Sequence, residues 1–284
     1  MNKSLTIVLP AYKSRRLLLN HIKKISKKTK IIIVDNSYDK KLKNEIENKF
    51  KNVSVFLKKN IGYGAAINFG SKHVKTKYFL VINPDTKIYK NTIKNLLIAA
   101  KKLKVFGALS PDQIENKNKN FNKVNHVKQK QLDGGAMLFD KNIFRKTKGF
   151  DENIFLYYEE NDFYHKCSLL KYDLFLIKNS YFYHSQKGDS SSAIFVDNKV
   201  KKYAYLVGGW HGQWSRFYFL KKYNGYIYSL LKCFPNLIGN LIKLVLNIFI
   251  NFDKAKYLYF KIEGLLCSIL GMPSYKRNRY DNYN

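Results

Sequence analysis

Carboxylates are scarce in this chain, which has 20 acidic residues against 52 basic ones, and three of them lie together. Glu159, Glu160 and Asp162 repel one another, which raises the pKa of at least one of them unless a cation is near. A carboxylate with a raised pKa can serve as a general base. The alternative is an acid-rich first turn of a helix, where the helix dipole favours carboxylates. Both interpretations stay open at this point.

A second candidate site follows the apolar run Phe79–Ile82, which predicts a buried strand. The side-chain oxygens of Asn83 and Asp85 can hold a hard divalent cation that bridges a diphosphate. An ordinary turn at Pro84 is the alternative. His184, at the end of another predicted strand, is either a metal ligand or a core histidine, and by itself it favours the core.

Two further segments could approach a ligand. Asp35 follows the apolar run Ile31–Val34, and its carboxylate can bind a ring N–H of a base or a ribose hydroxyl, or cap a helix. The small residues in segment 60–68 let the backbone approach a ligand at the start of a helix. This segment is not a dinucleotide fingerprint, because Ile67 occupies the third glycine position. A tight packing turn is the alternative.

The elements that must position these residues alternate in type along the first hundred residues. Strand patterns cover residues 5–9, 31–34, 53–57 and 78–82, and helix patterns cover residues 15–26, 42–50 and 64–74. Such alternation predicts an α/β fold with βαβ units, a mostly parallel sheet flanked by helices, and a ligand crevice at the carboxyl ends of the strands.

The second half of the chain is less regular. Residues 112–130 are rich in Asn, Lys and Gln and predict a loop or an excursion at the edge of the sheet. Structure then resumes, with strands expected at 136–139, 173–177 and 181–184, helices at 141–146 and 157–170, and a turn at 149–151. From residue 201 the composition shifts to Tyr, Leu and Ile. We therefore expect a first domain of residues 1–200 and a helical appendage of residues 201–284.

One segment of the appendage has a pronounced pattern. Asn236, Asn240, Lys243, Asn247 and Asn251 fall on one stripe of a helix whose other residues are apolar or Gly. A helix of this kind suits a membrane interface, packing on the protein's own core or a contact in an oligomer. The polar residues and a proline argue against a membrane-spanning helix.

The formal net charge of +32 is spread along the chain, since residues 205–284 hold only 11 of the 52 basic residues. Three explanations of this charge stay open: codon bias of an AT-rich genome, binding to an anionic membrane or substrate, and binding to nucleic acid. The last would need a clustered patch of basic residues. The three cysteines lie far apart, so neither a disulfide nor a zinc site is expected. The apolar run at the N-terminus is too short for a signal peptide, which predicts a cytoplasmic protein.

Together and in this order, the motifs resemble family 2 inverting glycosyltransferases of the GT-A fold, a Rossmann-like nucleotide-binding fold, and especially their rhamnosyltransferase-like branch. The resemblance covers roughly residues 4–220. It is carried by Leu9–Tyr12, Val34–Ser37, Asn60–Gly64 with Asn68 and Gly70, Asn83–Thr86, Gly134–Leu138, Gly149–Glu152, Phe155–Asp162 and Tyr183–His184.

The resemblance implies a role for each matching position. The nucleotide-sugar site would comprise Pro10, Ala11, Tyr12, Asp35, Asn60, Gly62, Asn83, Asp85, Gly134 and Gly135. Asp85 would hold Mn or Mg, with His184 as a second ligand that would favour Mn. Arg216 is a candidate to support the diphosphate, or it is a surface charge.

The catalytic base of this family is usually the Asp of a Glu-Asp pair, and here Glu160 takes that place after Glu159. We expect Glu160 to be the base, with Asp162 as second choice. The implied reaction transfers a sugar from dTDP-rhamnose or a UDP-sugar to a lipid-linked or oligosaccharide acceptor, with inversion, in the synthesis of a surface polysaccharide such as capsule or O-antigen. It would take place at the inner face of the cell membrane, without nucleic acid as a partner. A catalytically idle scaffold and a basic nucleic-acid-binding protein are the alternatives.

Overall fold

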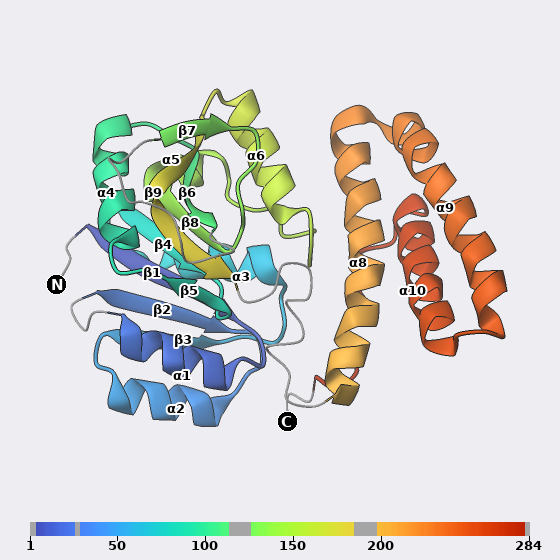
Figure 1. The fold of residues 1–284 in the computed structure, drawn as a ribbon, viewed down its shortest axis with the longest axis horizontal. Helices are drawn as coiled ribbons and strands as arrows, with labels where there is room; N and C mark the ends of the chain where they lie inside the picture. The colour runs from blue at the N-terminus through green and yellow to red at the C-terminus, as the bar shows by residue number, and fades with distance from the viewer. Residues whose placement is uncertain (1–3, 26–28, 114–125, 185–197, 282–284) are drawn as a thin grey trace.

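The structure, a computed structural model, describes residues 4–25, 29–113, 126–184 and 198–281. Within these residues the first part of the chain forms one nine-stranded sheet in the order β3-β2-β1-β4-β8-β6-β9-β5, with β7 paired to β9 (Figure 1). The strands are β1 Leu5–Ala11, β2 Lys30–Asp35, β3 Val53–Leu57, β4 Tyr78–Ile82, β5 Thr86–Ile88, β6 Ala108–Gln113, β7 His126–Gln129, β8 Ala136–Asp140 and β9 Leu174–His184.

The sheet is mixed, and its two parts have different pairing. β1 pairs in parallel with β2 and β4, and β2 pairs in parallel with β3. β8 then runs antiparallel to both β4 and β6. The order 3-2-1-4 reverses direction between β1 and β4, which creates a crevice at their carboxyl ends where ligands bind in open α/β sheets. The expected α/β fold is therefore confirmed, but the sheet is not mostly parallel, because β6 pairs in parallel with β9 while β5 and β7 both pair antiparallel with β9.

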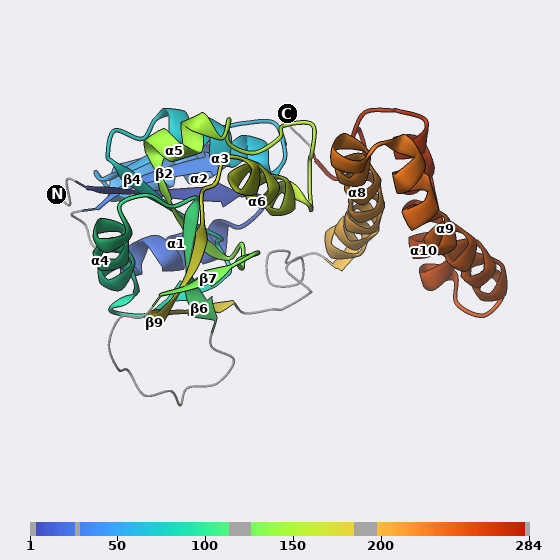
Figure 2. The ribbon, with the colours of Figure 1, turned by 90° about the horizontal axis from the view of Figure 1, so that it is seen from above.

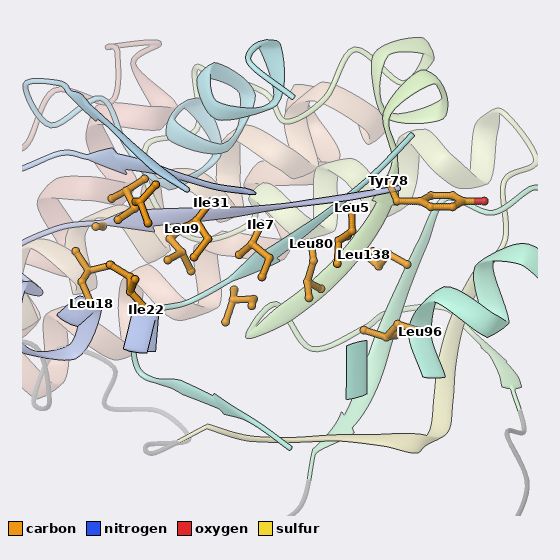
Figure 3. Close-up of a cluster of buried hydrophobic side chains, with 14 of the residues drawn as sticks. Leu5, Ile7, Leu9, Leu18, Ile22, Ile31, Tyr78, Leu80, Leu96 and Leu138 are labelled. Atoms are coloured by element: carbon orange, nitrogen blue, oxygen red, sulfur yellow. The ribbon is translucent and has the colours of Figure 1, made fainter. Parts of the chain in front are cut away.

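Helices cover both faces of the sheet, as seen from above in Figure 2. One face packs against α1 (Arg15–Lys24), α2 (Lys40–Lys49) and α4 (Thr92–Leu103), and the other against α3 (Tyr63–Lys72), α5 (Lys141–Lys146) and α6 (Glu159–Leu169). Alternate residues of a strand point to opposite faces, so Leu5, Ile7 and Leu9 of β1 join Leu18 and Ile22 of α1 in one core layer (Figure 3).

Several bounds differ from the expectations. The two strands expected at 173–177 and 181–184 are one strand, β9, whose register with β6 shifts between Pro111 and Asp112. β7 lies inside the segment expected to be a loop or an excursion at the edge of the sheet, of which residues 114–125 fall outside the described part. α6 begins at Glu159 because Tyr157 and Tyr158 have φ values of 65° and 72°, which a right-handed helix cannot include.

The C-terminal part is helical, as expected. It consists of α8 (Asn198–Asn224), α9 (Tyr226–Ile248) and α10 (Phe252–Ile269), with α8 next to the sheet part and α9 beyond it (Figure 1). Lys222 of α8 joins the two parts, because its Nζ lies 2.5 Å from an oxygen of Asp162 and 2.7 Å from an oxygen of Asp151. The three cysteines, Cys167, Cys233 and Cys267, are buried free thiols.

The wide apolar face of α9 is exposed. Asn240 from the polar stripe is buried against the protein, and Asn251 lies beyond α9, where it caps the start of α10 through the backbone N–H of Lys254. On the opposite face Leu231 and Val245 are 70% and 63% exposed. Among the described residues, α9 is by length and composition apolar enough to cross a membrane. Only 17% of its most apolar stretch of 18 residues is buried inside the protein.

Candidate active site

A cavity of about 310 Å³ lies at the carboxyl ends of β1 and β4, where the strand order reverses. It brings together ten of the residues expected from the sequence: Pro10, Ala11, Tyr12, Asn60, Gly62, Asn83, Asp85, Glu159, Glu160 and His184. These residues come from five separate segments of the chain. Motifs that are each weak by themselves therefore line one cavity.

The loop before α3 forms one wall through a close backbone contact. Gly62 has φ +95°, and a Cβ at this position would lie 2.6 Å from the carbonyl oxygen of Phe155. The next residue, Tyr63, donates its backbone N–H to that same oxygen at 3.1 Å. The carbonyl of Gly62 accepts a hydrogen bond from the Asn36 amide at 3.0 Å. Glycine is thus required at 62 for both conformation and space.

Strand pairing brings the candidate metal ligands together. β5 runs antiparallel to β9 with Thr86 opposite His184, so Asp85 lies beside the imidazole. His184 Nε2 is 3.2 Å from Asp85 Oδ1, and the interaction with this carboxylate raises the pKa of His184 despite the partial burial of the ring. A carboxylate and an imidazole suit Mn or Mg, with Mn favoured by the nitrogen. The described residues include no cluster of three or more such ligands, so a cation held here would need further oxygens from a diphosphate or water.

The expected base sits in the first turn of α6. Glu159 is buried, and both this burial and the charge of Glu160 raise its pKa well above the usual range. Burial also raises the pKa of Glu160, with a smaller contribution from Asp133. A Cβ on Gly134 would collide with Glu160 Oε1. Gly134 therefore leaves the space that the Glu160 carboxylate occupies.

Tyr63 is a site residue that sequence reasoning missed. Its hydroxyl lies 3.0 Å from Asn83 Oδ1 and 3.2 Å from the carbonyl oxygen of Gly134. Burial and the nearby Glu160 raise the pKa of Tyr63 well above 10.0, so the phenol stays neutral. It can therefore donate a hydrogen bond and hold the segment after β4 close to Gly134. The only sequence signal was its place between Gly62 and Gly64.

Asp35 and Gly135 lie near the cavity without lining it. Both oxygens of Asp35 accept backbone hydrogen bonds, from Ser37 at 3.0 Å and Asp39 at 2.8 Å, while burial raises its pKa. Asp35 thus fixes the turn that presents Asn36 to the cavity. Gly135 accepts a hydrogen bond from the backbone N–H of Asn83 at 3.0 Å, which joins β8 to the end of β4.

Asp162 and Arg216 also lie outside the cavity lining. Asp162 is fully buried and contacts Lys222 and Lys166, and it accepts a hydrogen bond from the Tyr223 hydroxyl at 2.7 Å. Its carboxylate therefore ties α6 to α8. Arg216 lies on α8. Burial raises the pKa of Tyr158, and the positive charge of Arg216 offsets part of that rise.

The remaining walls come in part from segments that carried no recognisable motif. Ala204 and Val207 belong to α8, and Asn278 lies near the C-terminus, whereas Phe155 and Leu156 precede α6 in the segment 155–162 that carries the resemblance. Because Ala204, Val207 and Asn278 approach the cavity only through packing between the two parts of the chain, no local pattern identified them.

Comparison with known proteins places this geometry in context. The sequence model described as glycosyl transferase family 2 matches residues 6–176. Comparison with curated proteins gave no match. Among solved structures, the crystal structure of GalNAc-T7 with UDP, GalNAc and Mn2+ is similar over 73% of this chain, with a TM-score of 0.55 and 14% identity. The match covers 51% of that other chain, so this chain spans about half its length. At this identity the likeness shows the fold.

Proposed function

The chain belongs to glycosyl transferase family 2, and from that premise we propose that it transfers a sugar from a nucleoside-diphosphate sugar to an acceptor hydroxyl, with inversion at the anomeric carbon. The observation that carries the proposal is the cavity at the carboxyl ends of β1 and β4. It contains both Asp85, a candidate metal ligand, and Glu160, a candidate general base. Asp85 beside His184 suits a cation bound to a diphosphate. Glu160, with its raised pKa, suits a general base.

The chemistry assigned to the chain is a single displacement. Glu160 accepts the proton of the acceptor hydroxyl while the acceptor oxygen forms its bond to the anomeric carbon. The bond from that carbon to the diphosphate oxygen breaks, and the nucleoside diphosphate leaves with those electrons. Asp85 and His184 would hold Mn or Mg, which when bound would neutralise charge on the diphosphate. Tyr63 keeps Asn83 and Gly134 in place around the reacting groups.

For the donor we propose a UDP-sugar or dTDP-rhamnose, and for the acceptor a lipid-linked or oligosaccharide glycan that becomes part of a surface polysaccharide. The UDP and Mn2+ in the structurally similar GalNAc-T7 support a nucleotide sugar with a divalent cation. The resemblance of the motifs to the rhamnosyltransferase-like branch supports rhamnose as the sugar.

A thermal-shift screen of nucleotide sugars with Mn or Mg tests this function. A donor present at 100 times its Kd stabilises the folded protein by about 2.7 kcal/mol, so we expect Tm to rise by several degrees for the correct nucleotide. The rise should disappear with a chelator. If no nucleotide sugar raises Tm with either cation, the transferase proposal fails. Salt-sensitive binding of generic nucleic acid would then favour the rival function.

We also propose that the protein is cytoplasmic and binds the inner face of the cell membrane through α9. The outward side of this helix carries a contiguous apolar surface of Ile227, Leu231, Phe234, Ile242, Val245 and Leu246, all exposed. A soluble monomer rarely exposes so many large apolar side chains together. Lys232 and Lys243 are exposed on the same helix, and a basic residue near an anionic leaflet contributes about 1 kcal/mol to binding. An interfacial helix has this combination of features.

Vesicle flotation tests the membrane proposal. We expect the protein to float with vesicles of phosphatidylcholine and anionic phosphatidylglycerol. Binding of the double variant Leu231→Glu, Val245→Glu should weaken more than tenfold, because burying each apolar side chain contributes about 1.5–3 kcal/mol. The matched control is Leu169→Glu at the end of α6, since Leu169 is 66% exposed and Leu231 is 70% exposed. Equal flotation of the double variant and the control would contradict the proposal.

A further inference from the structure

The C-terminal tail, residues 270–281, returns from α10 to the cavity of the sheet part. Trp214 of α8 donates its indole N–H to the carbonyl of Met272 at 2.9 Å, which directs the tail back along α8. Six residues later Asn278 lines the same cavity as Pro10 and Glu160. The tail is therefore a wall of the candidate donor site, although it is the segment farthest from the motifs in sequence.

A buried histidine fixes the tail before it reaches the cavity. His211 is fully buried, and its Nε2 lies 2.8 Å from the carbonyl oxygen of Lys276. A carbonyl can only accept, so Nε2 carries the proton and Nδ1 accepts from the Ser274 hydroxyl at 3.0 Å. Burial lowers the pKa of His211 to about 3, so the imidazole stays neutral and keeps this arrangement. The Arg277 guanidinium then lies 3.7 Å from the centre of the Phe155 ring.

A second set of contacts fixes the tail after the cavity. The Tyr12 hydroxyl donates a hydrogen bond to Asp281, and Lys13 pairs with the same carboxylate at 3.3 Å. Lys13 Nζ also donates to the carbonyl of Tyr280 at 2.7 Å. Tyr12 and Lys13 follow directly after β1, the strand expected to border the nucleotide. The tail is thus held on both sides of Asn278, which presets the position of this side chain.

Asn278 has a polar group that the described part of the protein does not satisfy. The residue is 6% exposed, and its Oδ1 accepts the backbone N–H of Tyr280 at 3.1 Å, which sets the orientation of the amide. Its Nδ2 is buried and finds no hydrogen-bond partner among the described residues. A buried donor without a partner is costly, so an acceptor oxygen supplied by a ligand in the cavity would satisfy it.

We propose that Asn278 is a donor-binding residue whose amide N–H₂ donates a hydrogen bond to an oxygen of the nucleoside, either a ribose hydroxyl or a pyrimidine carbonyl. The nucleoside is the part of the donor assigned here because the tail is anchored at Tyr12 and Lys13, beside the end of β1. The inference rests on the proposed function. The inference adds to the proposed function that the C-terminal part of the chain completes the nucleotide site.

Binding of nucleoside diphosphates to the full chain tests this inference. The probe is UDP or dTDP, whichever stabilises the unchanged protein, and its Kd is measured by calorimetry alongside the Kd of the matching nucleotide sugar. We expect Asn278→Ala to raise both Kd values by about tenfold, the loss given by one hydrogen bond. Tm without ligand should change by at most a few degrees, because the variant removes the unpaired Nδ2 but also the Oδ1 that accepts the backbone N–H of Tyr280. Asn278→Asp should weaken binding further, since it places a negative charge near the anionic ligand.

Arg279→Ala provides the matched control. Its guanidinium lies 4.9 Å from the centre of the Tyr203 ring, and Arg279 does not belong to the cavity lining. Its Kd values should equal those of the unchanged protein. Equal Kd values for Asn278→Ala and the unchanged protein would overturn the inference, and so would a loss matched by Arg279→Ala. A loss confined to the nucleotide sugar would overturn the nucleoside contact. An unchanged protein that binds no nucleoside diphosphate would overturn the proposed function as well.

Discussion

Glu160→Gln is expected to lower turnover by about 100-fold to 10,000-fold, the usual contribution of a positioned general base, while the Kd of the donor stays nearly the same. The amide of glutamine keeps the shape of the side chain but cannot take the proton of the acceptor hydroxyl. Turnover of nucleotide sugar and acceptor under saturating conditions, together with the donor Kd from calorimetry, separates these two effects. A loss of donor binding without a loss of turnover at saturation would contradict the assignment.

The pH dependence provides an independent test of Glu160. A base must be ionised to act, and burial raises the pKa of this carboxyl above its ordinary value. Turnover should therefore rise with pH through a midpoint above about 4.3, the usual pKa of glutamate. That acid limb should disappear in the residual activity of Glu160→Gln. The matched control is Glu45→Gln on α2, where Glu45 pairs with Lys49 on the surface at 2.9 Å.

Two further variants decide which carboxylate is the base. If Glu159→Gln loses turnover to the extent expected for Glu160→Gln, and Glu160→Gln does not, the base is Glu159. Glu160→Asp retains the carboxylate on a side chain shorter by one methylene, so we expect turnover between those of Glu160→Gln and the unchanged protein. Asp162→Asn is a poor test of catalysis, because Asp162 holds Lys222 and its loss loosens the junction of α6 with α8.

The second large effect is expected at Asp85. Asp85→Ala removes the carboxylate that would face the diphosphate, and a bound cation contributes several kcal/mol of charge stabilisation. Turnover with Mn should therefore fall by at least about 100-fold. A titration of Mn in the presence of the nucleoside diphosphate, followed by calorimetry, should show the loss of the cation-dependent part of binding. His184→Ala should show a smaller loss of the same kind.

The matched control for Asp85 is Asp112→Ala. Asp112 pairs with Lys178 at 3.3 Å and lies outside the cavity lining, so the change removes a carboxylate of the same size elsewhere on the protein. Its response to Mn should equal that of the unchanged protein. Unaltered cation dependence of turnover in Asp85→Ala would contradict the assignment of the metal to this residue.

The first half of the fold was predictable because local signals there agree with one another. Ile31–Val34 is apolar on both faces, as a central parallel strand requires, and the polar turn after it ends the strand. The pairing of β5 with β9 was not predictable, because it joins segments almost a hundred residues apart and neither strand is strongly patterned. Local residue patterns therefore suggested Asp85 and His184 only separately, and it was the family resemblance that implied a shared metal ion.

In the candidate site, too, the sequence identified residues by local signals but not the contacts they make. Its position after a strand identified Asp35, the acidic cluster identified Asp162, and a basic side chain made Arg216 a candidate, but the surroundings of all three depend on tertiary contacts. Asp35 is occupied by two backbone N–H groups, and Asp162 by Lys222 and Tyr223 from α8. No periodicity or spacing encodes such partners.

The shared cavity also limits how a protein of this design can change over generations. The cavity is lined by Ala204, Val207 and Asn278 from the C-terminal part and by Pro10 and Tyr12 from the sheet part. The two parts of the chain must therefore be inherited together for the cavity to stay intact. A recombination near residue 200 that exchanged the helices for those of a distant relative would separate Tyr12 from Asp281 and Asp162 from Lys222 in one event. Viable hybrids would have to exchange these contact partners as matched sets, so the two parts should diverge in step with each other.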